Sequence, residues 1–136
     1  MVRFLSVILI IVGAVACSSG EHMAAAQEGI AAFRQLVEAQ QFAKVHASGS
    51  EELRKSISEE DLAKILRGLN TKLGKARSVE TNGWNVNYHT SGTFVTLGFK
   101  TEFEKGHGIE QFIFRIADGK ALLVSYNVNS PVLLAN

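Results

Sequence analysis

The sequence has few of the residues that most often carry chemistry or constrain a chain. It contains one cysteine, one proline and one tryptophan in 136 residues. A single cysteine cannot form a disulfide within the chain. With 46% hydrophobic and 20% charged residues, the composition is that of a globular protein and not of a disordered one. The length leaves room for a single domain with one core.

The sequence also has no excess of charge of one sign. Lysine and arginine number 14, and aspartate and glutamate number 13. A balanced charge provides no long-range attraction to nucleic acid. We therefore expect no nucleic-acid partner.

No pair of histidines has the spacing of a metal site. His22, His46, His89 and His107 are far apart in the sequence and fall in different segments. Zinc sites are built from ligands a few residues apart, so the sequence predicts no metal and no cofactor. No residue is assigned a catalytic role.

A hydrophobic run long enough to span a membrane is missing as well. The apolar stretch from Phe4 to Ala16 has about 13 residues, and a membrane-spanning helix needs about 20. Arg3 precedes this stretch, and small residues follow at its end. This arrangement is typical of a secretory signal peptide.

The segment Ala14-Val15-Ala16-Cys17 resembles the lipobox of bacterial lipoproteins. The resemblance implies that residues 1–16 are cleaved off and that the sulfur of Cys17 carries a diacylglyceryl group. Two or three acyl chains hold a protein durably at a membrane. Since Ser18 stands where an aspartate commonly retains such proteins in the inner membrane, the resemblance implies the outer membrane, facing the periplasm.

The segment after the cysteine is predicted to be a tether. Residues 17–23 then comprise the lipidated cysteine and a flexible connection, and residues 24–136 form one domain. Two alternatives stay open at this point. A signal peptidase cut after Ala16, or after Ala24-Ala25-Ala26, would give a secreted soluble protein, and an uncleaved leader would remain as a short anchor.

Helical periodicity dominates the first half of the domain. From Ala24 to Ala47, apolar residues recur at spacings of three and four. Ser58-Glu59-Glu60-Asp61 is a capping box that opens a second strong helical pattern, and this pattern ends at Leu73. Gly74 follows where a C-terminal cap belongs.

After Arg77 the period changes to two, as expected for strands. Four strands are predicted, around Trp84–Tyr88, Val95–Phe103, Phe112–Ile116 and Leu122–Val128. Asp118-Gly119 is a strong two-residue hairpin signal between the last two. Helices followed by consecutive antiparallel strands predict an α+β fold, with N-terminal helices packed on one face of a curved four-stranded antiparallel sheet.

The pattern from Gly29 to about Asn129, a helical stretch ending in Leu73-Gly74 before four strands, resembles small bacterial envelope proteins. These belong to the cystatin-like (nuclear-transport-factor-two-like) superfold. The resemblance implies a fold and hardly a function. Together with the lipobox, it leads us to expect a membrane-anchored binding or interaction module.

The strand pattern also predicts an interface on the open face of the sheet. If Val95 and Leu97 face the helices, the opposite face has an apolar centre formed by Phe94, Ile113 and Leu123. Such a patch fits an envelope protein partner or a homodimer. The alternative is that these apolar residues are scattered and have no binding role.

A small-molecule carrier or an isomerase-like enzyme is the alternative function. It would need a cavity between helices and sheet, for which Tyr88 and Tyr126 are the candidate pocket residues. Both tyrosines are otherwise expected in the core with a hydrated hydroxyl. Glu110 lies near a predicted hairpin, so we expect it at a solvated edge and not buried with a raised pKa.

Overall fold

The computed structural model describes residues 19–135, which form helices followed by strands. The helices are α1 (Ser19–Glu38), α2 (Phe42–Ala47), α3 (Glu51–Ser56), α4 (Glu59–Leu73) and a short α5 (Pro131–Leu134). The strands are β1 (Ala76–His89), β2 (Gly92–Phe103), β3 (Gly106–Ala117) and β4 (Lys120–Asn129). The predicted α+β class is confirmed.

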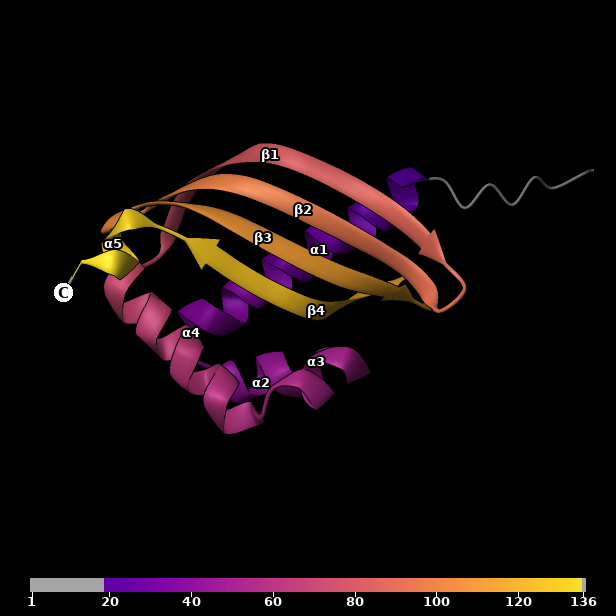
Figure 1. Cartoon of the computed structure of the whole chain (residues 1–136), viewed down its shortest axis with the longest axis horizontal. Coiled ribbons are helices and arrows are strands. Elements are labelled where there is room, and N and C mark those ends of the chain that lie inside the picture. The colour runs from indigo at the N-terminus through magenta and orange to yellow at the C-terminus, as the bar shows by residue number, and fades with distance from the viewer. Residues whose placement is uncertain (1–18, 136) are drawn as a thin grey trace, which may run out of the picture.

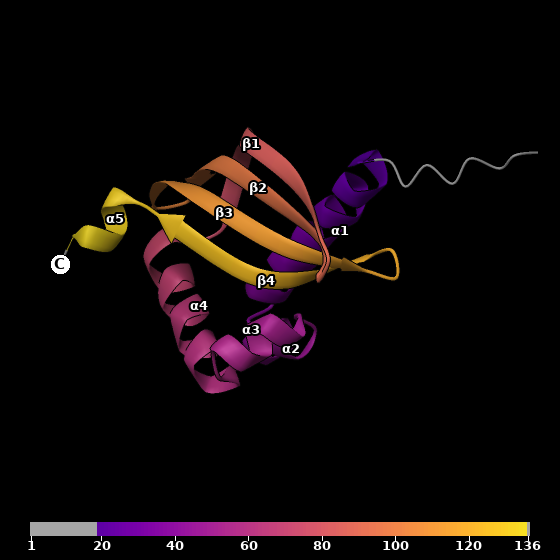
Figure 2. The same cartoon turned by 45° about the vertical axis from the view of Figure 1, so that its right-hand side comes forward.

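The four strands form one antiparallel sheet in the order β1-β2-β3-β4. The sheet curves around α1, and α2, α3 and α4 lie beyond α1 on the same side (Figures 1 and 2). The predicted hairpin at Asp118-Gly119 is confirmed, since these residues have φ angles of 51° and 75°. Positive φ at both central residues is what a type I′ turn requires.

The caps predicted for the helix before the sheet are present at both ends of α4. The Ser58 hydroxyl accepts a hydrogen bond from the Asp61 amide at 3.1 Å, which satisfies one of the free N–H groups of the first turn. Gly74 ends the helix with a φ of 73°, a conformation that costs glycine little. The chain then turns directly into β1.

α1 packs closely on the sheet and begins earlier than the sequence predicts. A Cβ atom on Gly29 would lie 2.8 Å from Cε1 of Phe114, so only glycine allows this approach. The predicted tether is corrected, because α1 starts at Ser19 and includes Met23. The reason is burial: Met23 packs against the core, and Ala26 has no exposed surface.

The core lies between α1, α2 and α4 on one side and the sheet on the other. Every residue of the buried core cluster falls between Ala26 and Leu123. The rings of Phe112 and Phe114 on β3 are at its centre and are at most 1% exposed.

None of the helices between residues 19 and 135 combines the length and the apolar character needed to cross a bilayer.

Candidate functional site

A carboxylate is buried at the inner face of the sheet. Glu110 on β3 has 0% exposed surface and pairs across the sheet with Phe99 of β2. Side chains alternate along a strand, so Glu110 lies on the same face as Phe112 and Phe114. A buried ionised carboxylate is costly unless it is paired and hydrogen-bonded.

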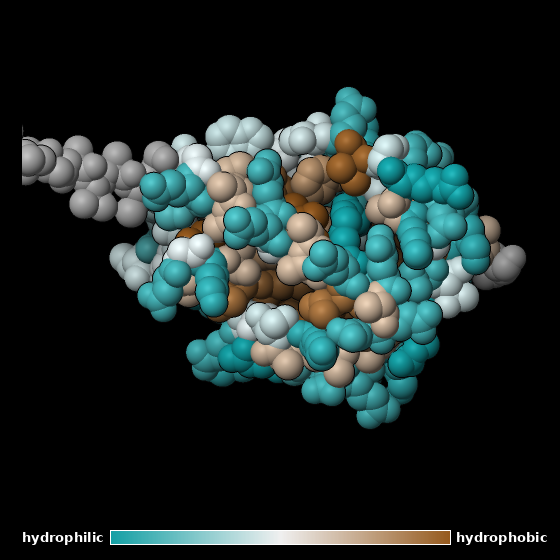
Figure 3. Space-filling view, turned by 180° about the vertical axis from the view of Figure 1, so that it is seen from behind, coloured by the Kyte–Doolittle hydropathy of each residue, from teal (hydrophilic) through white to brown (hydrophobic). Residues whose placement is uncertain are grey.

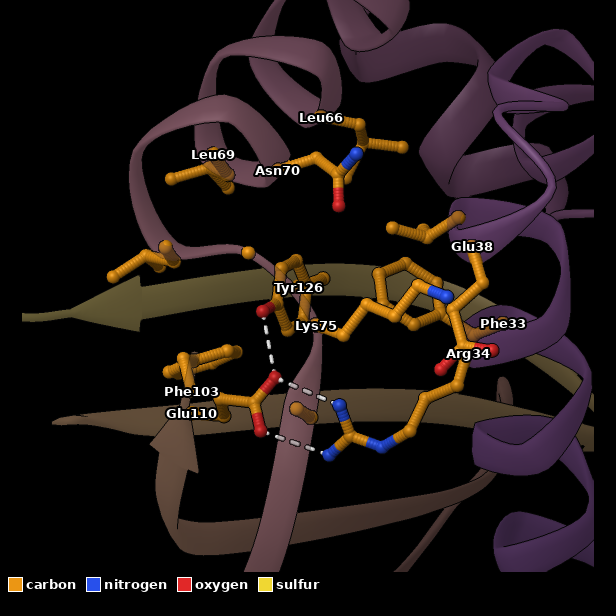
Figure 4. A pocket seen from close by; sticks show the side chains of 14 residues that line it. Phe33, Arg34, Glu38, Leu66, Leu69, Asn70, Lys75, Phe103, Glu110 and Tyr126 are labelled. Atoms are coloured by element: carbon orange, nitrogen blue, oxygen red, sulfur yellow. Dashed lines mark hydrogen bonds and ion pairs between the residues drawn. The ribbon is translucent and has the colours of Figure 1, made fainter. Parts of the chain in front are cut away.

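Protein donors surround this carboxylate (Figure 4). Arg34 of α1 donates to both oxygens, with Nη2 at 2.8 Å from Oε1 and Nη1 at 3.3 Å from Oε2. The Tyr126 hydroxyl of β4 donates to Oε2 at 2.7 Å. The Thr101 hydroxyl of β2 donates to Oε1. One helix and three strands thus meet at Glu110.

The same contacts determine the protonation state of Tyr126. Burial raises the pKa of its hydroxyl well above the usual value, and the adjacent Glu110 carboxylate raises it further. A phenolate at this place would be desolvated and would face a negative charge. Tyr126 therefore stays a neutral hydrogen-bond donor.

The cavity beside these residues is small. It lies between α1, α4 and the sheet, is lined by Phe33, Leu66, Glu110 and Tyr126 among others, and has a volume of about 40 Å³. A water needs roughly 10–15 Å³ by this measure, so the cavity admits a few waters and no organic substrate.

The geometry of Glu110 also opposes a role as general base. A carboxylate has about four lone-pair sites, and Glu110 accepts four hydrogen bonds from Arg34, Tyr126 and Thr101. A general base needs a free lone pair within hydrogen-bond reach of substrate. The cluster links α1 to the sheet, and it leaves Glu110 no free lone pair to accept a proton from a substrate.

A second hollow lies at the other end of α1 and is larger. This groove, which we call the α1–β1 groove, has a volume of about 730 Å³, within the 300–1,000 Å³ typical of ligand sites. Within residues 19–135, no charged residue lines it; the lining residues are Ser19, Gly20, Met23, Gln27, Ile30, Val79, Thr81, Trp84, Leu97 and Phe99. On the face that carries α1, hydrophobic side chains lie in hollows between hydrophilic ones (Figure 3).

The groove wall on β1 is exposed. Trp84 is 59% and Val79 51% exposed, although both stand on the sheet face that the helices cover elsewhere. Tyr88, on the same strand, is 60% exposed, and its ring lies 5.8 Å from that of His22 in the first turns of α1. β1 is an edge strand, and the first turns of α1 leave these side chains more than half exposed.

The predicted interface patch does not form as expected. Leu123 is 7% exposed and belongs to the core, so its placement on the open face is corrected. The physical reason is a register shift between Ile113 and Phe114 where β3 pairs with β4, since an extra residue in one strand reverses which face the following side chains take. Phe94 and Ile113 are only half-buried, and the Arg115 guanidinium lies over the Phe94 ring at 4.7 Å from its centroid.

The two candidate pocket tyrosines are not brought together. Tyr126 packs against the core, as expected, and it borders the small cavity, where its hydroxyl donates to Glu110. Tyr88 is exposed on β1, with His22 of α1 as its aromatic contact. The expectation that Tyr88 lies in the core is therefore wrong.

The sequence reasoning missed the burial of Glu110. The prediction of a solvated edge is wrong, because Glu110 has no exposed surface. Glu110 precedes Phe112 by two residues and Phe114 by four, and side chains two residues apart on a strand share a face. This spacing is the sequence signal that places Glu110 on the buried face. Cys17, the predicted lipidation site, lies outside the described residues.

The chain has a family match. Residues 30–126 match the family described as "Protein of unknown function (DUF4019)". This match includes the four residues of the Glu110 cluster and six of the ten residues that line the α1–β1 groove. No curated protein matches the chain.

Proposed function

The chain belongs to the DUF4019 family, and we propose that it is a lipid-anchored binding module of the bacterial envelope. In this proposal Cys17 carries the lipid, and the domain lies in the periplasm on the outer membrane. The lipobox-like Ala14-Val15-Ala16-Cys17 supports the anchor. Helices followed by a four-stranded sheet that curves around α1 support a cystatin-like fold.

The observation that carries the binding role is the contrast between the two hollows. The polar cluster at Glu110 adjoins a cavity of about 40 Å³, which is too small for a ligand. The α1–β1 groove is open, uncharged and about 730 Å³ in volume. Exposed apolar walls such as Trp84 and Val79 are typical of a surface that contacts a partner.

The position of α1 favours cleavage before Cys17 over the alternative site. A cut after Ala26 would remove Ser19 to Ala26 from α1. Ala26 is fully buried in the core cluster, so this cut would remove packed residues. A cut before Cys17 leaves α1 whole.

The anchor is tested by mass spectrometry of the mature N-terminus, using protein extracted from membranes of the producing bacterium. We expect the first residue to be Cys17 with the added mass of a diacylglyceryl group and an amide-linked acyl chain. Cys17→Ser should abolish the added mass and the cut, whereas the neighbouring Ser18→Ala should keep both. An unmodified start at Cys17 or at Gln27 would contradict the proposal.

A further inference from the structure

Exposed aromatic side chains gather around the beginning of α1. Trp84 lines the same groove as Ser19 and Gly20, and Tyr88 packs edge-on against His22. Trp84 and Tyr88 are both more than half exposed. Large apolar surfaces left open at one place mark a site that meets an apolar environment.

The chemistry of this face suits a lipid bilayer. Tryptophan and tyrosine are enriched at the membrane–water interface, where an apolar ring and a polar tip are both satisfied. Among the described residues, the groove lining contains no charged side chain, so contact between the groove and acyl chains would desolvate no charge of that lining. The face has no cluster of basic residues among those lining it, so the contact does not depend on anionic lipid.

The chain before α1 places this face close to the proposed anchor. Cys17 precedes Ser19 by two residues, which span at most about 7 Å. Since α1 begins at Ser19, the described structure contains no linker that would hold the domain away. This step rests on the proposed lipidation of Cys17.

We infer that the face formed by the first turns of α1 and the exposed part of β1 rests on the membrane that holds the anchor. Trp84 and Tyr88 lie at the level of the lipid headgroups, and the α1–β1 groove opens toward the acyl chains. The bilayer is thus the partner of the groove. The cluster at Glu110, near the other end of α1, faces away from it.

Trp84 makes this inference directly testable, because it is the only tryptophan in the chain. The lipidated full-length protein is placed on phosphatidylcholine vesicles whose acyl chains carry bromine, and Trp84 emission is compared with that on unbrominated vesicles. We expect roughly a twofold loss of emission, as for an interfacial tryptophan. Adding anionic lipid should not change the result.

Matched variants locate the contact. Val79→Glu places a charge on the groove wall and should restore most of the emission. Asn85→Glu places the same charge beside Trp84 on the opposite face of β1, where Asn85 pairs with Thr96, and should leave the quenching unchanged. Both positions are exposed, so neither change should unfold the domain.

Flotation of the same samples separates the two proposals. Protein that floats with the vesicles while Trp84 is not quenched would overturn the membrane-contacting face and leave the anchor standing. Protein that carries no lipid and does not float would overturn both. A third outcome is a protein that sediments as a dimer and whose Trp84 emission is insensitive to bromine. This outcome would identify a second copy of the chain as the occupant of the α1–β1 groove, and it would also overturn the inference.

Discussion

The two ends of α1 contact the same sheet in opposite ways. Near Arg34, the Glu110 carboxylate of the sheet is fully buried. Within residues 19–135, its hydrogen-bond donors are Arg34, Thr101 and Tyr126. Near Ser19, the sheet presents Trp84 and Val79, which are more than half exposed. At the Arg34 end, protein donors satisfy the buried carboxylate. At the Ser19 end, apolar side chains stay exposed.

This difference between the two ends of α1 bears on which of them has room to bind a ligand. A buried cluster of Glu, Arg and Tyr has the residue types of an active site, but the lone pairs of its carboxylate are used and its cavity is too small for an organic substrate. The uncharged groove has no reactive group, yet it has the size and the openness that binding needs. Residue types alone would point to the end of the helix where the cavity is too small for an organic ligand.

The largest expected effect comes from unpairing the buried carboxylate. Arg34→Met removes the guanidinium and leaves Glu110 buried without its cation. We expect the free energy of unfolding, measured in urea, to fall by about 3–5 kcal/mol. The double variant Arg34→Met, Glu110→Leu should recover at least half of that loss, because apolar residues replace the ion pair. A loss under about 1 kcal/mol would mean that Glu110 reaches water.

A smaller effect is expected from Tyr126 at high pH. The folded state raises the pKa of this hydroxyl, while the unfolded chain ionises near pH 10. Below pH 10 this ionisation has no effect; above it the unfolded state releases the proton first, so stability falls by up to about 1.4 kcal/mol per pH unit. Tyr126→Phe should lack this component when the two proteins are unfolded at pH 9 and at pH 11. Parallel curves for the two proteins would contradict the assignment.

The smallest effect is expected at the open end. Trp84→Ala should change the free energy of unfolding by less than about 0.5 kcal/mol, because more than half of the side chain is already in water. Phe112→Ala, which removes a fully buried ring from the same face of the sheet, should cost about 3–5 kcal/mol. If Trp84→Ala proved as costly as Phe112→Ala, the groove would be part of the core.

Local signals in the sequence were enough for much of the fold. The capping serine Ser58, the terminating Gly74 and the Asp118-Gly119 turn all act within a few residues, and all three were confirmed. The four strands and their antiparallel order followed from the period of two and from short connections. These features depend on neighbours in the chain and not on tertiary contacts.

The errors came from effects that neighbouring residues do not encode. The face of the sheet on which Leu123 lies depends on a register shift between β3 and β4, and no residue of β4 indicates this shift in the sequence. The burial of Glu110 depends on Arg34, which is 76 positions away in the sequence. The exposure of Tyr88 depends on how much of β1 the first turns of α1 cover, where His22 is its aromatic contact.

The pairing of Arg34 with Glu110 also has a consequence for how the chain folds. The sheet strands are neighbours in sequence and can pair as hairpins, but a sheet formed without α1 would hold a carboxylate on its apolar face. Docking of the first helix buries that carboxylate and brings Arg34 to it in the same step, through a contact with a sequence separation of 76. Closing such a long loop costs entropy before its contacts form. We therefore expect α1 to dock after the hairpins pair, and a chain without its first helix to expose the apolar face of the sheet and to be cleaved faster by proteases.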